Sequence, residues 1–157
     1  MYTLKNNLNY SKKKIFTFLV VIVLISFGLK MITIDFDSLP QNDVLGYTLR
    51  AVSNFNGDFT ELPRKTLGWS LFVSPIIGIG NSENFMDLLN SIRGISLIVS
   101  LASIYPMYLL ARRFFDEKYS LVATFLFAVE PHLNHNAGLG LSEPLFILVT
   151  ILSVYFV

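Results

Sequence analysis

The chain has 157 residues, of which 53% are hydrophobic and only 15% are charged, and its formal net charge is +1. Soluble domains usually carry about a quarter charged residues, so this composition favours an integral membrane protein over a soluble domain. The near-neutral balance provides no broad basic face for nucleic acid, and the absence of cysteine excludes disulfides, thiolate metal sites and a cysteine nucleophile.

The first predicted element is a membrane-spanning helix over residues 15–34, preceded by a cytoplasmic tail over residues 1–14. Lys12, Lys13 and Lys14 precede an apolar run of about 20 residues, which is enough to cross a hydrocarbon core about 30 Å thick. A cleaved signal peptide is the competing interpretation of such a run. We favour the spanning helix because the later apolar segments require an anchored, polytopic protein, and the basic flank places the N-terminus in the cytoplasm.

An outer loop over residues 35–87 follows, and we expect it to contain short interfacial helices. Residues 43–55 have apolar side chains at helical spacing, which predicts a short amphipathic helix. Residues 69–80 are apolar but are interrupted by a proline and two glycines, so this segment of about a dozen residues fits an interfacial or re-entrant piece better than a span. Lys30, just before the loop, is expected to extend its ammonium group to the interface.

The second half of the chain predicts further spanning helices over residues 88–111, 118–135 and 144–157. A basic cytoplasmic loop over residues 112–118 connects the first two, and it falls on the same side as the lysine-rich tail if residues 69–80 do not cross. The last segment begins with a proline at an early helical position, where the missing N–H costs little. It spans only about 21 Å, so we expect a truncated chain or a fragment.

These elements together predict an all-α integral membrane protein with about four transmembrane helices. Two functional classes are compatible with the residues. One is an enzyme with an acidic site at the outer membrane surface, and the other is a non-enzymatic membrane component such as a transporter piece or an assembly subunit. Transporters place their polar groups near the midplane, whereas the polar groups of this chain concentrate at one face and in the long first loop, which favours the enzyme.

Polar groups near the outer helix ends are the candidate site residues, because ionisable side chains at membrane depth are costly and tend to mark sites or to pair. Asp43 begins the first-loop helix, and Tyr47 lies four residues later on the same helical face. Glu143 precedes the last helix, and Arg93 lies near the outer end of the second span. Both acids have an alternative role as charges that stabilise a helix N-terminus, and Arg93 has an alternative role as an ion-pair partner of Glu130.

A divalent metal is a possible cofactor, and no other is indicated. His132 and His135 are three residues apart, a spacing that can bring two imidazoles to one metal ion. Histidines near an interface are more often solvated or hydrogen-bonded, which is the alternative for both. The candidate metal ligands are therefore weak ones, namely Asp43, Glu143 and His135.

The order and spacing of these motifs resemble the N-terminal part of the GT-C glycosyltransferases, the group that contains dolichyl-phosphate-mannose–protein mannosyltransferases and the lipid A aminoarabinose transferase. Residues 42–51 (NDVLGYTLRA) fit the family's first-loop motif Asp-(Glu)-x-x-Tyr-x-x-x-Ala, with Val44 in place of the second acid. Residues 93–96, 109–115 and 141–145 are similar to the start of the family's second helix, its cytoplasmic turn and its outer second loop.

The resemblance implies an incomplete GT-C-type bundle that is multi-pass in the cell membrane, with a cytoplasmic N-terminus. It also implies transfer of a sugar from a polyprenyl-phosphate donor to a protein, lipid or glycan acceptor on the outer face. Asp43 would be the catalytic acid that orients or deprotonates the acceptor. Tyr47, Glu143 and Arg93 would bind substrate, with Arg93 as a partner of the donor phosphate. We expect the 157-residue chain alone to be inactive, because the family's later helices and soluble domain are absent from it.

Overall fold

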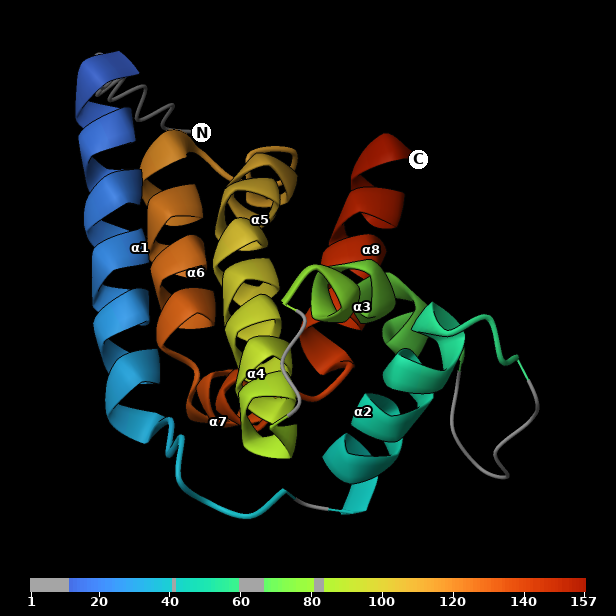
Figure 1. Ribbon diagram of the computed structural model, residues 1–157. Coiled ribbons are helices and arrows are strands. Elements are labelled where there is room, and N and C mark those ends of the chain that lie inside the picture. Colours follow the sequence, from blue (N-terminus) through green and yellow to red (C-terminus); the bar gives the residue numbers. More distant parts are fainter. Residues whose placement is uncertain (1–11, 41, 60–66, 81–83) are drawn as a thin grey trace, which may run out of the picture.

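The computed structural model describes residues 12–40, 42–59, 67–80 and 84–157, and this part of the chain is helical without strands (Figure 1). Parts of the predicted tail and outer loop, residues 1–11, 41, 60–66 and 81–83, lie outside the described residues. The helices in chain order are α1 (Lys12–Thr33), α2 (Asn42–Phe55), α3 (Leu67–Gly80), α4 (Phe85–Ala102), α5 (Ile104–Ala111), α6 (Glu117–Val129), α7 (Pro131–Leu139) and α8 (Glu143–Phe156).

Among the described residues, two helical segments are long and apolar enough to cross a membrane: α1, and the 27 residues that α4 and α5 form together. A helix that is apolar all round must be buried in a protein core or in a bilayer. In α1 the large side chains Phe16, Leu24 and Ile32 are 69%, 62% and 83% exposed, so the rest of the chain does not bury them. The expected third and fourth spans correspond to α6 and α8, which have 13 and 14 residues, so a spanning length is shown for two helices.

The basic residues on either side of the first spans lie at one end of the molecule. Figure 1 shows the N-terminal end of α1 and the connection between α5 and α6 at the same end, together with the C-terminal end of α8. The C-terminal end of α1 and the whole of α7 lie at the opposite end. We call the end at which α1 begins the basic end. It carries Lys12, Lys13, Lys14, Arg112, Arg113 and Lys118.

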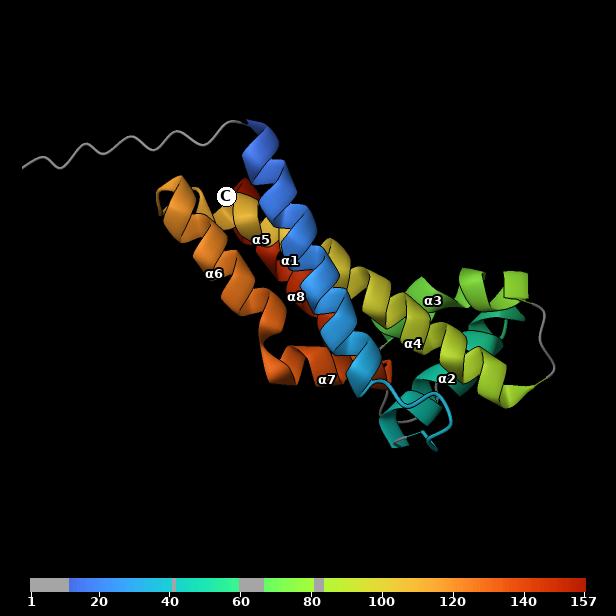
Figure 2. The same ribbon diagram turned by 90° about the vertical axis from the view of Figure 1, so that its left-hand side faces the viewer.

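The predicted helix over residues 118–135 is two helices in the structure, α6 and α7, which meet at Glu130. Pro131 is the first residue of α7, and a proline disfavours helical backbone in the residue before it, so Glu130 leaves the helical conformation with φ −59° and ψ 122°. The Glu130 carboxylate then accepts a hydrogen bond from the backbone N–H of Leu133 and caps α7. In Figures 1 and 2, α7 runs across the direction of α6.

Two apolar clusters hold the helices together. The first joins α2, α3 and α4 through buried side chains that include Ala51, Trp69 and Ile95, and α8 packs against it. The second joins α1, α5 and α6 through Ile22, Ile104 and Ala128. In both views α3 runs across the direction of α1, an orientation expected of an interfacial or re-entrant helix. That α3 does not span the membrane stays a prediction.

Candidate functional site

The turn between α7 and α8, residues 140–142, is held by side chains from helices distant in the sequence. Trp69 of α3 donates from Nε1 to the carbonyl oxygen of Gly140 at 3.1 Å, and Ser96 of α4 donates from Oγ to the carbonyl oxygen of Leu141 at 3.2 Å. Gly140 has a φ of +83°, a conformation that glycine adopts without steric cost. The turn therefore gives the beginning of α8 a defined position relative to α3 and α4.

Tyr47 of α2 meets this turn. Its hydroxyl oxygen lies 3.4 Å from Oγ of Ser142, the residue directly before Glu143. Asp43 lies one helical turn before Tyr47, about 6 Å away along the helix axis, and its side chain is exposed. The structure thus brings Tyr47 beside the residue that precedes Glu143, and it leaves Asp43 at the surface one turn away.

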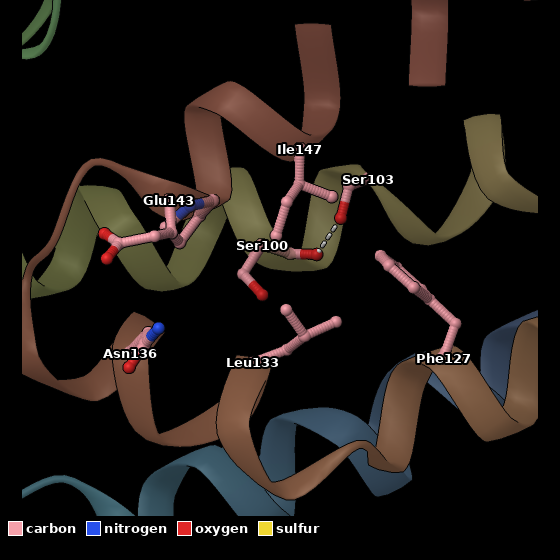
Figure 3. Close-up of a pocket in the computed structure, with 8 residues that line it drawn as sticks. Ser100, Ser103, Phe127, Leu133, Asn136, Glu143 and Ile147 are labelled. Atoms are coloured by element: carbon pink, nitrogen blue, oxygen red, sulfur yellow. Dashed lines mark hydrogen bonds between the residues drawn. The ribbon is translucent and has the colours of Figure 1, made fainter. Parts of the chain in front are cut away.

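Glu143 lines a small cavity between α4, α6, α7 and α8 (Figure 3). The cavity encloses about 10 Å³, which is room for about one water molecule. In Figure 3 the carboxylate of Glu143 and the amide of Asn136 lie on the same side, and Ser100 and Leu133 lie closer to the centre. Oε2 of Glu143 is buried and has no hydrogen-bond partner. A buried acceptor without a donor is costly, and the cavity that Glu143 lines has room for a donor about the size of one water molecule.

Arg93 is 1% exposed, and its guanidinium group is already engaged by the chain. Nη2 donates to the carbonyl oxygen of Ser38 at 2.9 Å and to its Oγ at 3.0 Å, and Nη1 donates to Oδ1 of Asn90 at 2.9 Å. These hydrogen bonds tie the segment after α1 to α4. The partners of Arg93 are thus Ser38 and Asn90 and not Glu130, and its Nε is buried without a hydrogen-bond partner.

The candidate metal ligands do not form a cluster. His132 and His135 are both exposed, and the side-chain amide nitrogen of Asn136 lies 3.2 Å from Nε2 of His132. Among the residues that the structure describes, no three His, Cys, Asp or Glu side chains are grouped so that they could hold a metal ion. Asp43, Glu143 and His135 are therefore not brought together as a three-ligand site.

The prediction that Lys30 extends its ammonium group to the interface is wrong, because Lys30 is buried. It is 2% exposed, and Nζ donates to Oγ of Ser26 at 3.0 Å and to Oδ1 of Asn134 in α7. The Ser26 hydroxyl donates to the carbonyl oxygen of Ala128, and the Asn134 amide donates to those of Ala128 and Glu130. The spacing of Ser26 and Lys30, one helical turn apart on the same face, was the available signal for this cluster.

Comparison with known proteins adds no family to this description. No family model matches the chain, no curated protein matches it, and no solved structure matches it. A functional interpretation therefore depends on the residues and the geometry described above.

Proposed function

We propose that the protein is a membrane glycosyltransferase that transfers a sugar from a polyprenyl-phosphate donor to a protein, lipid or glycan acceptor on the outer face of the cell membrane. The proposal includes a multi-pass arrangement with the basic end in the cytoplasm. The observation that carries it is the contact between Tyr47 and Ser142, which are 95 residues apart in the sequence. This contact joins the first-loop motif, in which the resemblance implies a catalytic acid, to the turn before Glu143, for which it implies a substrate-binding acid.

Asp43 is the proposed catalytic residue. Its exposed position at the beginning of α2 leaves the carboxylate accessible to an acceptor hydroxyl. In the transfer, the acceptor oxygen forms a bond to the anomeric carbon, and the bond from that carbon to the donor phosphate oxygen breaks. The acceptor proton passes to the Asp43 carboxylate, and polyprenyl phosphate leaves with the electron pair.

Tyr47 and Glu143 are proposed to position the substrates around Asp43. Tyr47 holds α2 against the turn between α7 and α8, and Glu143, directly after that turn, is the proposed substrate-binding acid of the second outer loop. Arg93 is the proposed partner of the donor phosphate on grounds of charge. Through Ser38 it also fixes the segment that leads from α1 to α2. A lipid-linked donor suits this arrangement because its phosphate lies at the interface and its tail stays in the bilayer.

The decisive experiment replaces Asp43 by Asn in the protein expressed from its natural open reading frame, assayed in membranes with polyprenyl-phosphate sugar donors. We expect transfer to fall by about 10²–10⁴-fold, since Asn keeps the shape of the side chain but cannot take the proton. Asp87→Asn is the matched control, because Asp87 is also an exposed acid in the first turn of a helix, α4. Expression and thermal stability of both variants should equal those of the parent.

The alternative roles give different results in the same assay. If Asp43→Asn retains transfer within about threefold of the parent, Asp43 is only a helix-start charge, which contributes about 0.3–1 kcal/mol to stability. If the parent transfers sugar from none of these donors, the enzymatic proposal is wrong and a non-enzymatic membrane component becomes the better interpretation.

A further inference from the structure

A groove lies between α1 and α6, the two helices at the front of the molecule in Figure 2. It encloses about 380 Å³ and is apolar apart from one lysine. Pockets of this size hold small molecules or parts of larger ones. The lining residues include Phe18, Val21 and Ile25 of α1, and Val122, Phe125 and Lys118 of α6.

Lys118 gives this groove a positively charged mouth. It lies in the first turn of α6 and is exposed, so it belongs to the basic end. Val122 and Phe125 follow at four and seven residues along α6, on the same face. An ammonium group at the head of an apolar groove complements an amphiphile that has an anionic head and a single apolar chain beneath it.

The length of the groove indicates which amphiphile fits. From Lys118 to Phe125 the α6 axis rises about 10 Å, roughly a third of the hydrocarbon core. The groove therefore has the length to hold the part of one acyl chain that is nearest its headgroup, in the leaflet at the basic end. It does not extend to the opposite face of the membrane. Anionic phospholipids give the cytoplasmic leaflet its negative surface potential, and they attract lysines near that surface.

We propose that the groove between α1 and α6 binds one acyl chain of an anionic phospholipid, whose headgroup pairs with Lys118. The bound lipid fills the space between two helices that otherwise meet mainly through the cluster around Ile22. The inference rests on the membrane location that is part of the proposed function, and it is independent of sugar transfer. Its occupant is a lipid of the surrounding bilayer and differs from the sugar donor.

The headgroup contact can be tested with the full chain in nanodiscs of equal phosphatidylcholine and phosphatidylglycerol, followed by native mass spectrometry of the lipids that stay bound. We expect the parent to retain phosphatidylglycerol in preference to phosphatidylcholine. Lys118→Gln should reduce that preference about fivefold, because it removes the ion pair between the lysine and the bound headgroup. Lys12→Gln removes an equal charge at the same end, outside the groove lining, and should change the preference less than about twofold, because salt screens a charge that does not touch the bound headgroup.

The chain contact is tested by filling the groove. Val122→Trp should reduce the retention of both lipids by about fivefold or more, because the indole occupies the space of the chain. Val149→Trp on α8 is the matched control, since Val122 and Val149 are 49% and 53% exposed, and it should leave retention unchanged. If Val122→Trp does not fold, the two lysine variants decide the proposal.

Three results would overturn the inference. Equal losses for Lys118→Gln and Lys12→Gln would show only a general attraction of the basic end. Unchanged retention in a folded Val122→Trp variant would show that the groove is not the lipid site. Displacement of phosphatidylglycerol by polyprenyl phosphate at equal concentration would assign the groove to the donor. Lipid retention is measured without an acceptor or sugar, so a failure of this proposal is distinct from a failure of the transfer assay.

Discussion

At the scale of single residues, Lys30 is the side chain whose environment differs most from expectation. A buried ammonium group is costly unless its N–H groups find acceptors. Nζ of Lys30 finds them in the neutral oxygens of Ser26 and Asn134. Asn134 also donates to two backbone carbonyl oxygens at the break between α6 and α7. The Asn134 side chain therefore connects the ammonium group of Lys30 in α1 to the beginning of α7.

The hydrogen bond between Lys30 and Asn134 predicts that substitutions of these two residues lower the stability of the protein by different amounts. Asn134→Leu leaves the Lys30 ammonium group without its acceptor in α7 and should lower the free energy of unfolding by about 2–3 kcal/mol. Lys30→Met removes the buried charge and leaves only the neutral Oδ1 of Asn134 without its donor, so it should cost less, about 1 kcal/mol. Denaturant unfolding of the purified variants in the same detergent measures both. A larger loss for Lys30→Met than for Asn134→Leu would contradict this account of the cluster.

At the scale of elements, the turn between α7 and α8 organises the candidate site. Its carbonyl oxygens accept hydrogen bonds from α3 and α4, and Ser142 meets α2. The turn can accept these hydrogen bonds because Gly140 adopts a left-handed backbone conformation, which is open to glycine without steric cost. The position of Glu143 is therefore set by a turn whose geometry depends on one glycine.

Replacing that glycine should disturb the site through the turn. In Gly140→Ala the new Cβ would lie 3.2 Å from Cγ2 of Ile92 and 3.4 Å from the backbone nitrogen of Arg93. Together with the left-handed backbone, this should cost about 1–2 kcal/mol of stability. Gly28→Ala is the control, since a Cβ there meets nothing within 4 Å and alanine favours the helix.

Thermal unfolding in detergent checks the direction of both changes. We expect Gly140→Ala to unfold at a lower temperature than the parent, and Gly28→Ala to unfold at the same or a higher temperature. If the protein transfers sugar, Gly140→Ala should also reduce the rate, because Glu143 follows the turn. A Gly140→Ala variant as stable as the parent would show that the turn has another accessible conformation.

For the whole molecule, the distribution of charge and apolar surface agrees with the orientation proposed above. The basic residues gather at one end, and the candidate site lies toward the other, where α7 is found (Figure 1). Large apolar side chains remain exposed between these ends on α1, α6 and α8, among them Leu24, Leu126 and Phe146 at 62%, 60% and 72%. Exposed apolar surface on several neighbouring helices is typical of contact with lipid.

The proposed topology predicts which positions an impermeant thiol reagent reaches from outside. The chain has no cysteine, so single cysteines at Asn56 and Asp116, both exposed, report one side each. In intact cells we expect labelling at position 56 and none at position 116, and labelling of both after the membrane is opened. The reverse pattern in intact cells would place the basic end outside and would contradict the proposed orientation.

Patterns of neighbouring residues were enough to predict the helical class and most helix positions in the described part of the chain. The predicted segments 15–34, 43–55 and 144–157 correspond to α1, α2 and α8 with small shifts at their ends. Apolar runs, helical spacing and prolines are properties of neighbouring residues, and these decide where a helix begins and ends. The same local signals predicted one helix over residues 118–135, whereas the chain turns at Pro131 into a separate helix.

Contacts between side chains that are distant in the sequence could not be predicted in this way. The burial of Lys30 against Asn134, the engagement of Arg93 by Ser38 and the contact of Tyr47 with Ser142 each join residues more than 50 positions apart. Such pairings depend on how helices pack and cross, because the direction of one helix relative to another is set by the side chains of both. A single sequence contains those side chains but does not specify their partners. Its polar residues therefore indicated candidate site residues, and their contacts depend on the fold.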